Sequence, residues 1–303
     1  MAPYHRICRV VLVLAAFAHA ITNQDNHVLL ASDKVKTELE KGNDFYDRGD
    51  YDTAIACYTK VIRLNSSSAV AYYGRGRAYY FKGEYDKAIE DYTKVIQLKP
   101  DNAEYYTYRG ASYYFKGELD QAIKDYTQVI RLDPKDADAY QDRGNAYCKK
   151  GENDKAIKDY SESIRLDPDN VWAYARRGLV YRWNGDYDKA IKDFTEVIKL
   201  KPDYAEYYAY RGASHYFKGE YDKAIEDYTK VIQLKPDNAE AYSSRGVAYK
   251  RKGELDQAIE DYTEAIRLDP DDAVTYTVRA KAYKRKGELQ KAKADLDKAK
   301  SLN

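Results

Sequence analysis

The sequence predicts an all-α fold, a solenoid of stacked antiparallel helix pairs, on three observations. One pattern of glycine, alanine, tyrosine and proline recurs every 34 residues from Val35 onward. Within each copy, apolar residues recur at helical spacing in two segments that a glycine separates. Tyrosine outnumbers phenylalanine by 34 to 6, which indicates that one residue type fills the same place in every copy. A repeat of this length is typical of stacked helical units.

Residues 1–20 are predicted to be a secretory signal peptide rather than part of the fold. Arg6 and Arg9 give a positively charged start, residues 10–18 form an apolar run, and Ala20 closes a small-residue cleavage motif. We therefore expect export to the periplasm or the medium, or entry into the secretory pathway if the source is eukaryotic. The alternative is a retained membrane anchor, although the apolar run is shorter than the ~20 residues that span a bilayer.

Residues 21–34 are predicted to be a short N-terminal segment, and the repeats occupy residues 35–303. Eight repeats start at Val35, Ala69, Ala103, Ala137, Val171, Ala205, Ala239 and Ala273. Because one helix pair of this size cannot bury its apolar face alone, each pair must stack on its neighbours.

The second repeat illustrates how each helix is predicted. Tyr72, Gly76 and Tyr79 share one face of a first helix, because residues three and four apart are neighbours on a helix surface. A second helix follows the glycine turn at Gly83, and Pro100 ends it before a polar pair caps the next helix. The same order of signals recurs in the other repeats.

The spacing Tyr-x-x-x-Gly-x-x-Tyr, followed by Gly, Ala-x-x-x-Tyr and Pro, resembles the tetratricopeptide repeat family over residues 35–303. The resemblance implies a right-handed superhelical solenoid whose first helices line a concave groove, and a non-enzymatic role in binding other proteins. Two features depart from the family pattern. Arg75 and its equivalents stand where the family often has leucine, and the terminal repeats are irregular, with Ser66 in place of proline and Ala280 in place of glycine.

The charge balance and the motif content exclude several classes of function. Lys and Arg number 51 against 50 Asp and Glu, so no strong basic field favours nucleic acid. The repeats hold no HExxH, no CxxC and no phosphate-loop lysine, and His215, the one histidine among them, is interpreted as a core residue in a tyrosine's place. Acidic runs such as residues 269–272 are interpreted as helix caps. We predict no catalytic residue, no metal and no cofactor.

Two rows of opposite charge recur with the repeat. They consist of Arg75, Arg109, Arg143, Arg177, Arg211, Arg245 and Arg279, and of Asp91, Asp125, Asp159, Asp193, Asp227, Asp261 and Asp295. Partly buried charges need partners, so these rows predict ladders of ion pairs or hydrogen bonds that fix how the repeats stack. Cys57 and Cys148 belong to the first and fourth repeats, and we expect no disulfide between them, because stacked units contact only their neighbours.

The positions that vary between otherwise regular repeats are the candidate binding surface. In the family arrangement these are residues two, five, nine and twelve of each first helix, and aromatic and arginine side chains among them are the types that dominate interfaces. The candidate site residues are Tyr73, Arg77, Tyr80, Tyr114, Gln141, Asn145, Trp172, Arg182, Tyr216, Lys250, Lys281 and Lys284. The hypothesis is that a peptide segment or helix of another protein docks here, with its acidic part toward the last two repeats. A simpler interpretation is a solvated face with packing between repeats.

Other functions stay open at this point. Trp172, Trp183 and the groove tyrosines could serve as stacking platforms of a carbohydrate or cell-wall binding protein. A chain that keeps residues 1–20 could be a membrane-anchored assembly factor, and only then would a membrane be a partner. The two-carboxylate clamp of chaperone-binding family members is not predicted, because only Asn43 matches it, while Leu39, Gly74, Glu104 and Tyr108 occupy the other places.

Overall fold

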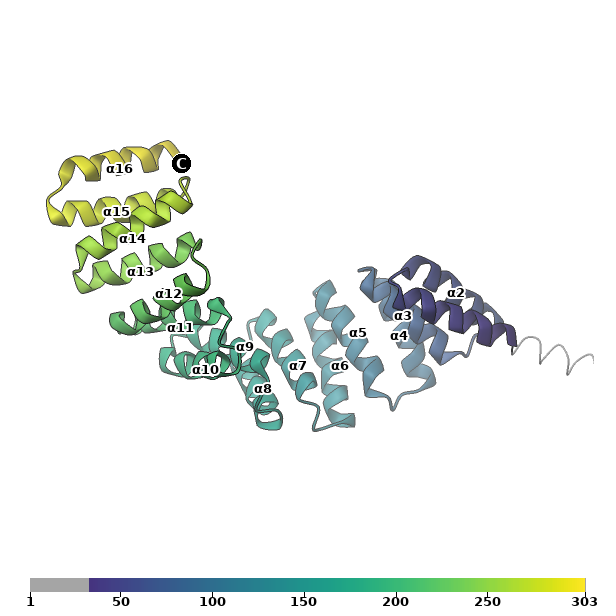
Figure 1. Ribbon diagram of the computed structural model, residues 1–303. Helices are drawn as coiled ribbons and strands as arrows, with labels where there is room; N and C mark the ends of the chain where they lie inside the picture. Colours follow the sequence, from purple (N-terminus) through teal and green to yellow (C-terminus); the bar gives the residue numbers. More distant parts are fainter. Residues whose placement is uncertain (1–32, 303) are drawn as a thin grey trace, which may run out of the picture. The chain divides into compact units, whose positions relative to one another are not determined.

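The computed structural model describes residues 33–302, and every regular element in this range is a helix (Figure 1). The predicted signal peptide and most of the predicted N-terminal segment lie outside the described residues. Contacts group the chain into two compact units, one up to Asp142 and one from Arg143 onward, and the boundary falls inside α7 (Ala137–Lys150). Each unit is a stack of antiparallel helix pairs.

The first unit begins with helical residues 33–47 and ends in the first part of α7. Between them lie α2 (Tyr51–Leu64), α3 (Ala69–Phe81), α4 (Tyr85–Leu98), α5 (Ala103–Lys116) and α6 (Leu119–Leu132). From α2 to α6, each helix packs against the next one in the chain. This is the nearest-neighbour packing that the repeat predicts.

The second unit continues from the remainder of α7 to the last described residue. It contains α8 (Asn153–Leu166), α9 (Val171–Trp183), α10 (Tyr187–Leu200), α11 (Ala205–Lys218), α12 (Tyr221–Leu234), α13 (Ala239–Lys252), α14 (Leu255–Leu268), α15 (Ala273–Lys286) and α16 (Leu289–Leu302). Seven of the residues predicted to start a repeat, from Ala69 to Ala273, are the first residues of helices. Val35 lies within residues 33–47, which are already helical.

Local signals set the helix boundaries as expected. The Asn102 side chain accepts a hydrogen bond of 2.9 Å from the Glu104 backbone N–H and so caps α5. Gly117 ends α5 with φ +89°, a left-handed conformation that glycine adopts without steric cost, and the Glu118 N–H then bonds to the Tyr113 carbonyl at 2.8 Å. Every repeat has a glycine in the equivalent turn.

The spacing of glycine and tyrosine, which recurs from repeat to repeat, reflects a close contact between the two helices of a repeat. Tyr92 of α4 is fully buried, and its ring lies against Gly76 of α3. A Cβ atom at Gly76 would lie 3.0 Å from Tyr92 Cε1, which is tighter than ordinary van der Waals contact. The large ring therefore needs the hydrogen side chain opposite it.

The arginine and aspartate rows form ion pairs inside the second to eighth repeats. Arg109 Nε and Nη2 donate to Asp125 Oδ2 and Oδ1, each at 2.7 Å, and the aspartate is buried. Arg109 Nη1 also donates to Thr93 Oγ1 of the preceding repeat at 3.1 Å. The ion pair thus joins the two helices of one repeat, whereas the hydrogen bond to threonine reaches the preceding repeat. Of the two kinds of ladder that the sequence predicts, it is the hydrogen bonds that link one repeat to the next.

Three further features concern expectations from the sequence. Among residues 33–302, no helix is both long and apolar enough to cross a bilayer. Cys57 and Cys148 are free thiols. Asp272 accepts a hydrogen bond of 2.9 Å from the Val274 N–H, which confirms that the acidic run before α15 acts as a helix cap.

Candidate functional site

In the first unit, α3 places three of the candidate residues beside tyrosines from other helices. The Arg77 guanidinium lies 4.4 Å from the centroid of Tyr46, 5.6 Å from that of Tyr73 and 5.8 Å from that of Tyr108. Tyr80 joins this group through Tyr108, at 5.9 Å between ring centroids. We call these five residues the Arg77 cluster. Its rings attract the guanidinium through their negative faces.

Arg77 has no acidic partner among the described residues, and its Nε atom is buried without a hydrogen bond. Tyr73 donates to Glu104 at 2.5 Å, and burial together with this bond raises the pKa of Tyr73. Burial also raises the pKa of Tyr80, to about 12. The phenols therefore stay neutral at physiological pH, and the cluster presents one positive charge framed by neutral rings.

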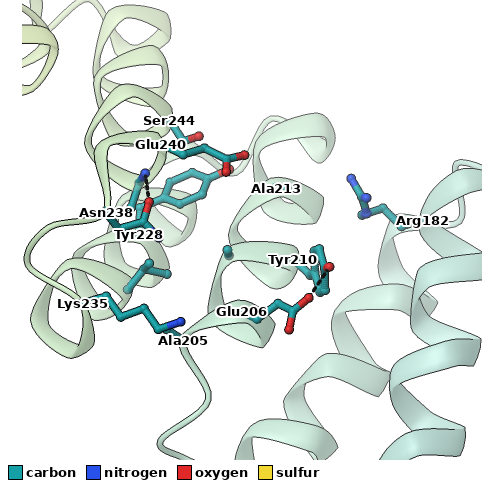
Figure 2. Close-up of a pocket in the computed structure, with 13 residues that line it drawn as sticks. Arg182, Ala205, Glu206, Tyr210, Ala213, Tyr228, Lys235, Asn238, Glu240 and Ser244 are labelled. Atoms are coloured by element: carbon teal, nitrogen blue, oxygen red, sulfur yellow. Dashed lines mark hydrogen bonds between the residues drawn. The ribbon is translucent and has the colours of Figure 1, made fainter. Parts of the chain in front are cut away.

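In the second unit, a pocket of about 460 Å³ opens between α9, α11 and α13 (Figure 2). Its floor is α11, where Ala205, Ala209 and Ala213 follow one another at intervals of four residues and so lie on one side of the helix. In α3 the places of Ala209 and Ala213 are taken by Tyr73 and Arg77. The pocket exists because these side chains are small.

Polar groups surround this alanine floor. Arg182 points toward the pocket from α9, 5.6 Å from the Tyr210 ring, and its Nε is buried without a hydrogen bond. Tyr210 donates to Glu206 at 2.6 Å, and burial followed by this bond raises the pKa of Tyr210 to about 12. Glu240 lines the opposite wall. Glu206 and Glu240 form no ion pair with another described residue. The pocket therefore combines an apolar floor with walls that carry charges of both signs.

Two of the C-terminal repeats carry lysine, Lys250 and Lys284, where earlier repeats have Tyr80, Tyr114 and Tyr216. Lys250 is half-buried on α13, while Lys281 and Lys284 are exposed on α15. Burial, and then the charges of Lys281, Arg251 and Arg285, lower the pKa of Lys250. The positive charge of Lys250 is therefore destabilised by burial and by the positive charges beside it.

The remaining candidate residues differ in how far they are available. Trp172 is 58% exposed, and Tyr114 is half-buried with its ring 5.5 Å from that of Phe115. Gln141 has a buried Oε1 without a hydrogen bond. Asn145 instead accepts a bond of 3.0 Å from the Tyr160 hydroxyl, and Tyr216 accepts one of 3.0 Å from Arg251 Nε, so both already have partners within the chain.

The candidate residues fall into separate groups. Gln141 and the four before it belong to the first unit, and Asn145 and the six after it belong to the second. The structure brings Tyr73, Arg77 and Tyr80 into one cluster, and it brings Lys250 beside Lys281. Arg182 lines the pocket of the second unit.

Sequence reasoning missed Tyr108 and Tyr210, the sixth residues of their repeats. Each lies four residues after the second position, at Glu104 or Glu206, so the helical spacing that selected the groove positions includes them. It also missed a row of exposed aromatic rings. Phe81, Phe115 and Phe217 are each more than half exposed and stack on a tyrosine of the preceding repeat.

No cluster of three or more potential metal ligands occurs between residues 33 and 302. His215 is buried, as expected of a core residue, and its Nδ1 lies 2.7 Å from Glu220 Oε2. The described side chains thus offer hydrogen bonds, charge and aromatic surface for binding.

Profiles of the tetratricopeptide repeat match most of the described chain. They cover residues 39–103, 110–151, 144–182, 171–204, 214–253, 239–272 and 261–294. No curated protein sequence matches the chain.

Solved structures share the fold. A MamA protein is 30% identical, with a TM-score of 0.54, over 58% of this chain and 96% of its own. The C-terminal part of a TPR protein from Cytophaga hutchinsonii is 22% identical, with a TM-score of 0.70, over 78% of this chain and 97% of its own. YrrB, described as a TPR protein with an unusual peptide-binding site, is 24% identical, with a TM-score of 0.57, over 62% of this chain and 97% of its own.

These matches, together with the tandem helix pairs, show an all-α solenoid of the kind that serves as a protein-interaction scaffold. The chain belongs to the tetratricopeptide repeat family.

Proposed function

We propose that this protein is a non-enzymatic scaffold that binds a segment of another protein along the face of its first helices. One observation carries the proposal: three candidate residues on this face keep a buried polar atom without a hydrogen bond. They are Arg77 Nε, Gln141 Oε1 and Arg182 Nε. Such an atom costs about 1–3 kcal/mol when unpaired, and native proteins keep few of them. A partner whose binding moves these side chains and pairs the three atoms gains this energy.

The shape of the second unit supports a peptide as the ligand. The pocket of about 460 Å³ at α11 lies beside Arg182 and has an alanine floor that a side chain can cover. Exposed Trp172 lies on α9, the same helix as Arg182. Aromatic and arginine side chains are the types that dominate the energetics of interfaces.

The test of this proposal begins with a partner captured by the purified chain from its own compartment. Replacing Arg182 and Trp172 by alanine should weaken binding of that partner at least about tenfold, since interface anchors of these types carry much of the binding energy. Arg267→Ala is the matched control, because Arg267 is an exposed arginine on second helix α14 that pairs with Glu264 at 2.6 Å. Unchanged affinity of the double variant in isothermal titration calorimetry would overturn the proposal.

A carbohydrate ligand is the second candidate, because two tryptophan side chains are exposed. Trp172 is 58% exposed and Trp183 is 62% exposed, and both belong to α9. Tryptophan fluorescence during titration with glycans distinguishes the two functions. A saturable change with a glycan, and none with partner peptide, would favour the carbohydrate.

We also propose that the protein is exported, on the basis of the signal-peptide pattern of residues 1–20. N-terminal sequencing of the natural protein tests this proposal. Ile21 as the first residue supports cleavage and release, whereas Met1 or Ala2 indicates a retained segment and an anchored protein.

A further inference from the structure

A group of five cations at the C-terminal repeats has no acidic partner. It consists of Lys250 and Arg251 on α13 and of Lys281, Lys284 and Arg285 on α15, and we call it the basic cluster. None of the five forms an ion pair with another residue of the described range. Uncompensated positive charge is thus concentrated on two adjacent helices.

Neighbouring lysines show that this arrangement is specific to the cluster. Lys252, two residues after Lys250, lies 2.6 Å from Asp222 and 2.6 Å from Glu254. Lys286, two residues after Lys284, pairs with Asp256 and lies 3.1 Å from Glu288. On both α13 and α15, therefore, one lysine is neutralised by acidic partners, and a second lysine, half a helical turn away, has no acidic partner.

Contacts with neutral groups hold the cluster in place. Arg285 Nη1 donates to the Lys250 carbonyl oxygen at 3.0 Å, and Arg251 Nε donates to the Tyr216 hydroxyl at 3.0 Å. These bonds fix the guanidinium groups without cancelling their charge. Lys250 is half-buried among three of the other four members, Arg251, Lys281 and Arg285, which lower its pKa together with burial.

We propose that the basic cluster binds a short acidic segment of the partner protein, a run of aspartate or glutamate side chains. The inference rests on the proposed scaffold function. It adds where on the chain the partner binds and which kind of side chain the partner presents there. Carboxylates supply the counter-charge that the five cations lack, and charge-assisted hydrogen bonds to Arg and Lys are among the strongest in proteins. Residues 273–303 carry nine Lys and Arg against three Asp and Glu, whereas the whole chain has a net charge of only +1.

The charge pattern of α13 favours a short peptide run over a long polyanion. Glu240, at the start of α13, forms no described ion pair and lies ten residues before Lys250, which is about 15 Å along a helix. Glu206 lies at the start of α11 and lines the pocket together with Glu240. A continuous polyphosphate chain crossing this face would meet these carboxylates, but a few acidic side chains confined to the C-terminal ends of the helices would not.

The experiment measures fluorescence anisotropy of labelled hexaglutamate with the full chain, and of labelled hexaglutamine as the neutral control. The test variant is Lys250→Gln with Lys284→Gln, and the matched control is Lys252→Gln with Lys286→Gln, which removes the same charge from the same helices. Circular dichroism checks that both variants are folded. We expect at least about tenfold weaker hexaglutamate binding for the test variant and less than about twofold for the control, with affinity falling as salt rises.

Several outcomes would overturn the inference. Equal losses for the two variants would show that only the net charge matters. Tighter binding of a single-stranded DNA oligonucleotide, or of vesicles containing phosphatidylserine, would assign the cluster to another polyanion. Salt-sensitive self-association in sedimentation experiments, lost in the test variant, would assign it to a second copy of the chain.

The captured partner separates failure of this inference from failure of the scaffold function. If that partner loses affinity for the Arg182→Ala and Trp172→Ala variant but not for the Lys250→Gln and Lys284→Gln variant, the scaffold function stands and the basic cluster is not its acidic subsite. If neither variant changes the affinity, both proposals fail.

Discussion

At the scale of the residue, the chain contains a natural substitution experiment. Residues 79–104 and 215–240 are identical except that His215 stands where the earlier copy has Tyr79. Glu84 bonds to two lysines, Lys82 and Lys87, whereas its counterpart Glu220 bonds to the two equivalent lysines and to His215 as well. A comparison of the two glutamates therefore shows how one additional hydrogen bond, from His215, changes the pKa of a glutamate in the same local sequence.

The pKa of Glu220 is predicted to lie below that of Glu84, and the difference should disappear in His215→Tyr. Hydrogen bonds from Lys218, His215 and Lys223 lower the pKa of Glu220 to about 2. Since this value is below the ~4.3 of an unfolded glutamate, the contact stabilises the fold above that pH, and the stabilisation is lost as the pH falls toward 2. Titration of the side-chain carboxyl carbons by NMR measures both values. Equal pKa values in the wild-type chain would contradict the prediction.

At the scale of the element, the two helices of a repeat fit because their residues are matched in size. A Cβ at Gly144 on α7 would lie 2.8 Å from Tyr160 Cε1 on α8. The eighth repeat shows the alternative solution, with Ala280 in the glycine's place and Leu296 in the tyrosine's place. Glycine accompanies the large ring, and alanine accompanies the smaller side chain.

Gly144→Ala should destabilise the protein by about 1–3 kcal/mol, the usual cost of overpacking a core. In a Tyr160→Leu background the same change should be neutral or stabilising, because the clash is gone and alanine favours a helix by ~1 kcal/mol over glycine. Urea unfolding of the four proteins measures the coupling. Ala280→Gly, which should only weaken α15, is the control, and an equal cost of Gly144→Ala in both backgrounds would contradict this account.

The limits of sequence reasoning also belong to this scale. Helix starts such as Ala103 were predictable because caps and glycine turns are local signals. The sequence predicted the Arg109 and Asp125 ion pair only as two rows, because spacing alone does not say whether an arginine reaches an aspartate of its own repeat or of the previous one. The α11 pocket escaped prediction because it results from small side chains, Ala209 and Ala213, whose shared effect appears only when neighbouring helices enclose the space.

At the scale of the whole molecule, each repeat depends on its neighbours for a covered apolar surface. Tyr262 of α14 is fully buried, and Ala282 and Val278 of α15 pack against its cluster. On α16, by contrast, the place equivalent to Tyr262 is occupied by Leu296, which is 42% exposed. The lysines of α16, Lys291, Lys293, Lys298 and Lys300, are exposed, which suits an outer face in contact with water.

Deletion of residues 273–303 should leave the other repeats helical but make the protein self-associate. The deletion uncovers Tyr262 and the buried Ala265 on α14, and exposed apolar patches of this kind promote association. Circular dichroism measures helicity per residue, and light scattering after gel filtration measures mass. Adding Tyr262→Lys to the truncated chain should restore the monomer, and a monomeric truncated chain without that change would contradict the prediction.

The bond from an arginine to the threonine or serine of the preceding repeat has a consequence for the history of the chain. It is made by Arg75, Arg109, Arg177, Arg211, Arg245 and Arg279. Thr93, which accepts from Arg109, lies two residues after Asp91, which pairs with Arg75, so α4 offers one acceptor to its own repeat and one to the next. A repeat with these residues can therefore follow another such repeat through the same hydrogen bond. Whole repeats can then be gained or lost without disturbing the contacts between their neighbours. The near-identity of residues 79–104 and 215–240 is what growth of the array by duplication would produce.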